Sequence, residues 1–140
     1  MKNKSKAQYL ISMPLCVKWG LRKPKNIYFN LNNYRNWHYQ LSNNLKKWYK
    51  ETAQSALRRA CVTPCTGIIC LEYVLWKRNK GKVDRSNVLS VHEKFFCDAF
   101  TELGYIPDDN DDYIESSYFT TGGIDRDNPR VDILIKEYLC

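Results

Sequence analysis

The chain has 140 residues with 44% hydrophobic residues and four tryptophans, which predicts one folded domain over residues 1–140 and excludes a disordered chain. No stretch of eighteen apolar residues occurs, so a membrane-spanning helix is excluded as well. The basic N-terminal segment lacks the apolar core of a secretion signal, and we therefore expect a cytoplasmic, intracellular protein without a membrane partner.

The formal net charge is +7, and the two signs are separated along the chain. Residues 1–50 contain eleven Lys or Arg and no acid, whereas residues 101–140 contain ten acids and three bases. A basic half beside an acidic cluster suits a protein that binds a polyanion and holds cations at one point.

Cysteine usage favours reduced thiols over a metal site. The six cysteines form no CxxC pair, and only two histidines accompany them. A zinc site usually needs two close pairs of ligands. We therefore expect free thiols, several of them filling apolar positions in a cytosolic protein.

Hydrophobic periodicity and turn residues predict the order β, α, β, α, β, β. The predicted elements are an edge strand over 8–19 that Pro14 interrupts, a short extended segment over 27–31, a helix from about 34 to 60, a strand over 67–76, a helix between Asp84 and Gly104, and strands over 113–121 and 130–139. This order indicates an α/β (α+β) fold with one mixed sheet and two principal helices.

The first predicted helix carries an aromatic stripe, with Asn32 or Asn33 as its expected N-cap. The residues of the stripe are Trp37, Leu41, Leu45 and Trp48. Such a stripe is typical of a core or a dimer contact, and less often of a surface that stacks on nucleic-acid bases.

A basic segment, KRNKGK, follows the predicted strand over 67–76. It is either a solvated loop or a contact for a phosphate backbone, and its position just before an acidic region favours nucleic acid. The residues that we expect to contact nucleic acid are Arg35, Lys77, Arg78, Lys80, Lys82 and Arg85.

The second predicted helix gathers the polar groups best suited to catalysis. On a helix that turns ~100° per residue, Asn87, Lys94 and Asp98 fall within roughly 40° of one another, at the border of the buried face. Asp84 precedes this helix, and the DDNDD segment follows it. Several carboxylates and one ammonium group are therefore expected to converge, which outlines a metal-dependent phosphoryl-transfer site.

Simpler interpretations of the same residues stay open. Aspartates near helix ends are commonly caps, and a DDNDD run is commonly a solvated loop. A calcium-binding loop is excluded, because it needs a glycine at its sixth position, where this chain has Tyr113 or Ile114.

Three linked motifs make the region specific enough for a family resemblance. They are Asp84-Arg-Ser-Asn87, Lys94-Phe-Phe-Cys-Asp98-Ala-Phe and Gly104-Tyr-Ile-Pro-Asp108-Asp109. They resemble the D-x-D-N, K-x-x-x-D-A-L and G-x-x-x-D-D motifs of the RusA-type Holliday junction resolvases, endonucleases found largely on phages and prophages. The segments FNLNNYRNWH and RVDILIKEY are also similar to the family, so the resemblance covers nearly the whole chain.

The resemblance implies roles for individual residues. Asp84 and Asp109 are expected to hold a metal ion, and Lys94 is the expected catalytic lysine, so these three form the implied catalytic set. Asp108 is a further candidate ligand. The implied cofactor is Mg²⁺, with Mn²⁺ as an alternative, and no small-molecule cofactor is implied.

The chain departs from the family motifs at two places. Ser86 stands where the family has its second aspartate, and the spacing from Asn87 to Asp98 is four residues longer. Asp98 is our candidate for the missing ligand, because it lies on the same helix face as Lys94. Ser86 is then a weak ligand or a helix cap, and both Ser86 and Asn87 have supporting roles.

The function implied by the resemblance is Mg²⁺-dependent cleavage of four-way DNA junctions by a homodimer, in recombination and repair. Metal-assisted phosphodiester hydrolysis needs carboxylates and a cation, and it needs no activated serine or cysteine. Two alternatives stay open: a branched-DNA-binding accessory protein that does not cut, and a nuclease that prefers other branched or single-stranded DNA. The resemblance also implies a phage or prophage origin.

Overall fold

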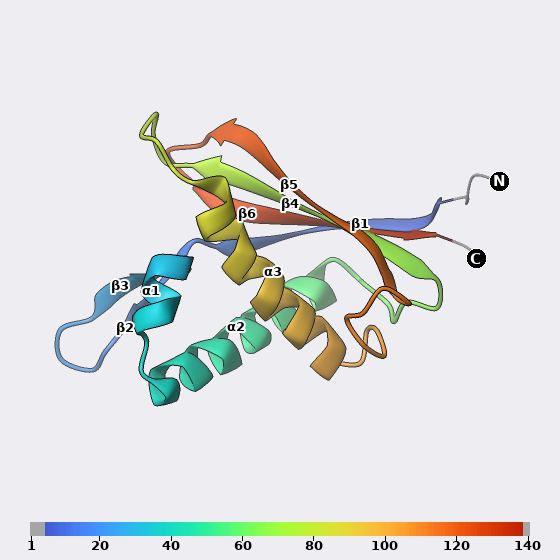
Figure 1. The fold of residues 1–140 in the computed structure, drawn as a ribbon, viewed down its shortest axis with the longest axis horizontal. Coiled ribbons are helices and arrows are strands. Elements are labelled where there is room, and N and C mark those ends of the chain that lie inside the picture. The colour runs from blue at the N-terminus through green and yellow to red at the C-terminus, as the bar shows by residue number, and fades with distance from the viewer. Residues whose placement is uncertain (1–4, 139–140) are drawn as a thin grey trace.

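The computed structural model describes residues 5–138 as a mixed α+β domain (Figure 1). The strands are β1 (Ser5–Pro14), β2 (Cys16–Trp19), β3 (Lys25–Tyr28), β4 (Ile68–Lys77), β5 (Ile114–Ile124) and β6 (Arg130–Tyr138). The helices are α1 (Leu31–Asn36), α2 (Tyr39–Arg59) and α3 (Arg85–Glu102). The predicted fold class is confirmed; residue 139, the predicted end of the last strand, lies outside the described residues.

The main sheet has four strands in the order β1-β6-β4-β5. β6 runs antiparallel to both β1 and β4, whereas β4 and β5 are parallel, with Ile69 opposite Ile114 and Lys77 opposite Ile124. Two parallel neighbours need a crossover connection, and α3 supplies it. Helices α2 and α3 lie on one side of this sheet (Figure 1).

The strand predicted over 8–19 is two strands that belong to different sheets. β1 ends at Pro14 and lies at the edge of the main sheet, as expected for a strand containing proline. β2 instead pairs with β3 in a separate antiparallel hairpin. The expectation of one sheet is therefore wrong, because the chain changes direction after Pro14 and the hairpin leaves the main sheet.

The helix predicted from 34 to 60 is also divided. The Asn30 side chain accepts the N–H of Asn33 and caps α1, so neither asparagine that we expected as a cap fills that position. Trp37 is extended, with φ −72° and ψ 131°, and α2 begins only after His38. No helix within residues 5–138 is both long enough and apolar enough to cross a membrane.

The break between α1 and α2 has a packing cause. Phe29 is buried, and the rings around it include Trp37 at 6.1 Å edge-on, Trp48 stacked at 5.8 Å and Phe95 at 6.0 Å. An extended residue at position 37 allows its indole ring to pack on Phe29. The aromatic stripe therefore belongs to the core, as the more favoured sequence interpretation held.

A buried carboxylate ties three strands together at one end of the main sheet. Asp132 on β6 accepts hydrogen bonds from the Ser12 hydroxyl of β1 at 2.6 Å and from the Trp76 indole of β4 at 2.9 Å. Arg130 donates to it at 2.9 Å and also pairs with Asp125 at 2.8 Å. These contacts satisfy a carboxylate that would be costly to bury alone.

His92 on α3 is a core residue. It is fully buried, and its Nδ1 lies 2.8 Å from the Tyr49 hydroxyl of α2. Burial lowers the pKa of His92 from 6.5 to about 3, because a charged imidazole would lose its hydration. Cys16, Cys61, Cys65, Cys70 and Cys97 are free thiols, and Cys140 lies outside the described residues.

The buried histidine predicts that acid destabilises the fold. The unfolded chain binds a proton at His92 below pH ~6.5, whereas the folded chain does so only near pH 3. Between these values the free energy of unfolding should fall by about 1.4 kcal/mol per pH unit as the pH falls, through this one group. Denaturant titrations at several pH values measure the slope.

The control is His92→Gln, which keeps a polar partner for Tyr49 but does not titrate. Carboxylates contribute to the pH dependence of both proteins, so the difference between the two slopes isolates the imidazole. Identical slopes for the wild type and His92→Gln would show that His92 is not held neutral by burial.

Candidate active site

Asp84 begins the candidate site region, and it is the N-cap of α3. Its Oδ1 accepts the backbone N–H of Ser86 at 3.1 Å and that of Asn87 at 3.4 Å. A carboxylate at this position satisfies free N–H groups and interacts favourably with the helix dipole. Asp84, and not Ser86, is therefore the N-cap of α3. Ser86 donates its backbone N–H to the Asp84 carboxylate.

The predicted convergence of Asp84 with Asp98 is wrong. The two residues are fourteen positions apart, with α3 between them. At a rise of 1.5 Å per residue, this spacing separates them by ~21 Å along the helix axis. The helical wheel compared the angles of Asn87, Lys94 and Asp98 but not their distances from Asp84 along the helix axis. No three His, Cys, Asp or Glu side chains in residues 5–138 are placed to hold one metal ion.

The DDNDD segment lies at the other end of α3 from Asp84. It precedes β5, whose first residue pairs near the start of β4, whereas Asp84 follows the end of β4. Figure 1 shows the two loops at opposite ends of α3. Asp109 is thus a neighbour of the last turns of α3.

Asp108 organises this loop. Its Oδ1 accepts the N–H of Asp109 at 2.8 Å, and its Oδ2 accepts the amide of Asn110 at 3.2 Å. Asn110 in turn accepts the N–H of Asp112 at 2.9 Å. These contacts match the loop interpretation, and a metal role for Asp108 stays a prediction.

Lys94 and Asp109, which two different motifs supply, line the same pocket of about 340 Å³. Lys94 lies on α3, and Asp109 lies on the DDNDD loop that follows α3. The other lining residues are Glu93, Cys97, Asp111, Ile114, Glu115, Ser116 and Ser117. We name this the acidic pocket. Hard oxygen donors are the ligands that Mg²⁺ prefers, so the donors here fit that ion in type.

Two acids of the acidic pocket, Glu93 and Glu115, escaped the sequence analysis, and Asp111 was considered only as part of the DDNDD segment. Glu93 lies beside Lys94 in the chain and outside the family motifs, so no motif indicated it. Glu115 follows the aspartate run and is the second residue of β5. The parallel pairing of β4 and β5, which sequence patterns did not predict, places this residue beside α3.

Asp98 lines a second pocket of about 250 Å³ together with lysines of α2, and it does not line the acidic pocket. Burial raises the pKa of the Asp98 carboxyl, Lys94 opposes that rise, and Asp109 adds to it. Lys94 and Asp109 thus share one pocket, Asp98 lines another, and Asp84 lines neither. A metal role for Asp98 stays a prediction.

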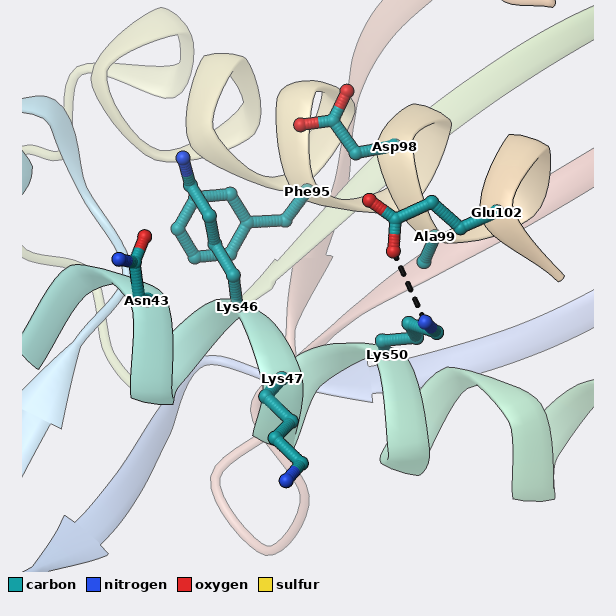
Figure 2. Close-up of a pocket in the computed structure, with 8 residues that line it drawn as sticks. All are labelled: Asn43, Lys46, Lys47, Lys50, Phe95, Asp98, Ala99 and Glu102. Carbon is teal, nitrogen blue, oxygen red and sulfur yellow. Dashed lines mark ion pairs between the residues drawn. The ribbon is translucent and has the colours of Figure 1, made fainter. Parts of the chain in front are cut away.

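The second pocket brings a basic helix face to the acids of α3 (Figure 2). The basic residues of α2 that line this pocket are Lys46, Lys47 and Lys50. Lys50 pairs with Glu102 at 3.1 Å, whereas Lys47 points away from α3. The Lys46 ammonium lies 5.9 Å from the Phe95 ring centroid. No sequence motif linked these lysines to the site.

The predicted nucleic-acid contacts lie mainly at the Asp84 end of α3. Lys77 ends β4, and Arg78, Lys80 and Lys82 are exposed in the loop that follows. Arg85 donates to the Thr121 hydroxyl at 3.2 Å on β5. The exposed Arg35 is in the last turn of α1. The basic loop therefore adjoins Asp84 but not the acidic pocket.

The cap geometry predicts how mutations change stability. Asp84→Ala removes the acceptor for two helix N–H groups and should lower the free energy of unfolding by about 1 kcal/mol. Asp84→Asn keeps an oxygen acceptor and should cost less. The control Ser86→Ala keeps the same backbone N–H and should change stability by less than about 0.5 kcal/mol. Urea titration measures all three, and equal losses for Asp84→Ala and Ser86→Ala would contradict the assignment.

Comparisons with protein-family models and with curated proteins find no match for this chain.

Proposed function

We propose that this chain is a Mg²⁺-dependent endodeoxyribonuclease that acts on branched DNA, with four-way junctions as its substrate class. The observation that carries the proposal is the meeting of Lys94 and Asp109 in the acidic pocket. The two residues come from separate motifs of one family pattern and from separate elements of the fold. Chance placement of acids on a surface would not explain why those two motifs meet.

Asp109 would supply one ligand to a cation in this pocket. Because no three acids within residues 5–138 are placed to bind one ion together, the remaining ligands would be water, a DNA phosphate or a residue of a second copy of the chain. A bound Mg²⁺ would supply Lewis-acid chemistry and a more acidic bound water. Lys94 would neutralise charge that builds on the phosphate in the transition state. Asp98 would help to position the Lys94 ammonium, since the two groups interact electrostatically.

The position of Asp84 bears on how the site is assembled. The family motif assigns Asp84 to the same metal site as Asp109, but α3 keeps them at opposite ends within one chain. The implied role and the observed separation are both satisfied when Asp84 of one copy joins the acidic pocket of a second copy. We therefore propose a homodimer with two sites shared between the subunits, which suits symmetric cutting of a junction.

The distance along α3 also sets the length of DNA contacted. Lys94 lies ten residues after Asp84, so the basic loop and the acidic pocket are separated by ~15 Å along the helix axis. That length corresponds to about four phosphates of one DNA strand. DNA that runs along α3 would place one stretch of backbone on the basic loop and a more distant phosphate at the acidic pocket.

A second candidate is a junction-binding protein that does not cut. Asp84 already accepts two helix N–H groups, and Ser86 replaces a ligand of the family motif. If no metal site assembles, the basic surface alone would bind branched DNA. This protein would show salt-dependent junction binding without cleavage in Mg²⁺ or Mn²⁺.

Cleavage of labelled synthetic DNA tests the proposal. We expect four-way junctions to be nicked in Mg²⁺ and not in a chelator, and to be preferred over flaps and single strands. Lys94→Met and Asp109→Asn should each lower the cleavage rate by at least about 100-fold. The matched control, Asp112→Asn, removes a neighbouring acid that does not line the pocket and should cleave normally. Normal cleavage by Asp109→Asn would overturn the proposed site.

Mixing two inactive variants tests the shared site. Asp84→Asn and Asp109→Asn homodimers should both be inactive. An equal mixture forms heterodimers in which one of two shared sites is intact, so nicking should return to about a quarter of the wild-type level. An inactive mixture would place all of the required acids in one chain. Normal cleavage by Asp84→Asn alone would remove Asp84 from the site.

Binding measurements separate DNA contact from chemistry. Neutralising Lys80 and Lys82 should weaken junction binding and reduce its dependence on salt, by about one unit of log–log slope for each phosphate that the protein no longer neutralises. Asp109→Asn should retain binding, because it removes a negative charge near the DNA. Unchanged binding in the lysine variants would exclude the basic loop as a DNA-binding element.

A further inference from the structure

A separate cavity lies at the Asp84 end of α3, away from the acidic pocket. Its volume is about 290 Å³, near the lower end of the ~300–1,000 Å³ range of ligand pockets. The end of β3, the end of β4 and the first turn of α3 enclose it. Its apolar walls include Leu15, Tyr28, Phe29, Leu75, Val83 and Val88. We name this the apolar cavity.

The mouth of the apolar cavity exposes two hydrophobic side chains, a class of residue that is usually buried. Val83 keeps 46% of its surface exposed and Tyr28 keeps 43%, whereas Phe29 behind them is buried. An aromatic ring at the mouth and aliphatic walls suit a flat, largely apolar group. A cavity of about 290 Å³ has room for a single heterocyclic ring system.

The charge around the apolar cavity selects an anionic partner. Lys77 and Arg78 line it, and no acidic residue does. Lys80 and Lys82 belong to the same exposed loop. Asp84 follows Val83 in the chain, but its carboxylate accepts helix N–H groups. A partner that offers a flat ring together with negative charge complements both features.

Two amide side chains add polar groups to the lining. Asn30 uses its oxygen for the N–H of Asn33 at 2.8 Å, and Asn79 uses its oxygen for the N–H of Gly81 at 2.8 Å. These bonds orient both amides and leave their NH₂ groups as the ends that can donate to a ligand. The carbonyl oxygens and ring nitrogens of a nucleobase are suitable acceptors.

We propose that the apolar cavity binds one unpaired nucleobase of a branched DNA substrate, while Lys77 and Arg78 contact the adjoining phosphates. The inference rests on the proposed function, and it adds how an unpaired nucleotide is recognised. The base stacks on Tyr28 and covers the apolar walls. Stacking of this kind contributes about 1–3 kcal/mol per base and tolerates any base sequence.

Junctions with one altered nucleotide test the inference. One probe carries a single unpaired 2-aminopurine at the branch point, and the other carries an abasic residue at the same place. The wild type should bind the first probe about 10-fold more tightly. Tyr28→Ala removes the stacking ring, and Val83→Trp fills the cavity from an exposed position; both should bring the ratio close to one. Tyr118→Ala, which removes another exposed tyrosine, is the matched control and should keep the wild-type ratio.

The outcomes separate this inference from the proposed function. A wild-type protein that binds neither probe overturns both. Binding of both probes with equal affinity overturns the nucleobase site alone, as does a preference for the base that Tyr28→Ala and Val83→Trp leave unchanged. A dimer that dissociates in Val83→Trp, with no change in the affinity ratio, would instead assign the cavity to an interface between two copies of the chain.

Discussion

The parallel pairing of β4 with β5 sets the positions of all the candidate functional groups. Parallel neighbours require a connection that returns to the starting end, and α3 provides it along one side of the sheet. One end of α3 therefore adjoins Asp84 and the basic loop, and the aspartate loop follows the other end, with Lys94 in the middle of the helix and Asp98 one turn further on. The chemistry that this fold can perform depends on how groups at those two ends are combined.

Sequence reasoning predicted the parts of this fold that depend on local pattern. The long strand over 67–76, the helix between Asp84 and Gly104 and the edge position of the first strand all follow from periodicity, capping and proline chemistry. The family motifs linked Lys94 with Asp109, and both residues line the acidic pocket. In each case the signal lies in residues close together in the chain.

The errors came from properties that local patterns do not contain. The helix break at Trp37 depends on packing of its indole ring against Phe29. This contact forms only in the folded core, so no local sequence pattern indicates it. The missing convergence of Asp84 and Asp98 has a geometric cause, since a wheel projects a helix onto a circle and discards its length. Glu115 joins the pocket through strand register, which no single strand reveals.

The position of β6 has a consequence for how the sheet is made. β6 lies between β1 and β4, yet it follows both of them in the chain, and Asp132 on β6 is the group that binds Ser12 and Trp76. During synthesis, β1 therefore has no strand to pair with until β6 leaves the ribosome, and β4 can pair only with β5. Until then the apolar face of β1 depends on the helices or on chaperones for cover, and the sheet closes in a late, long-range step.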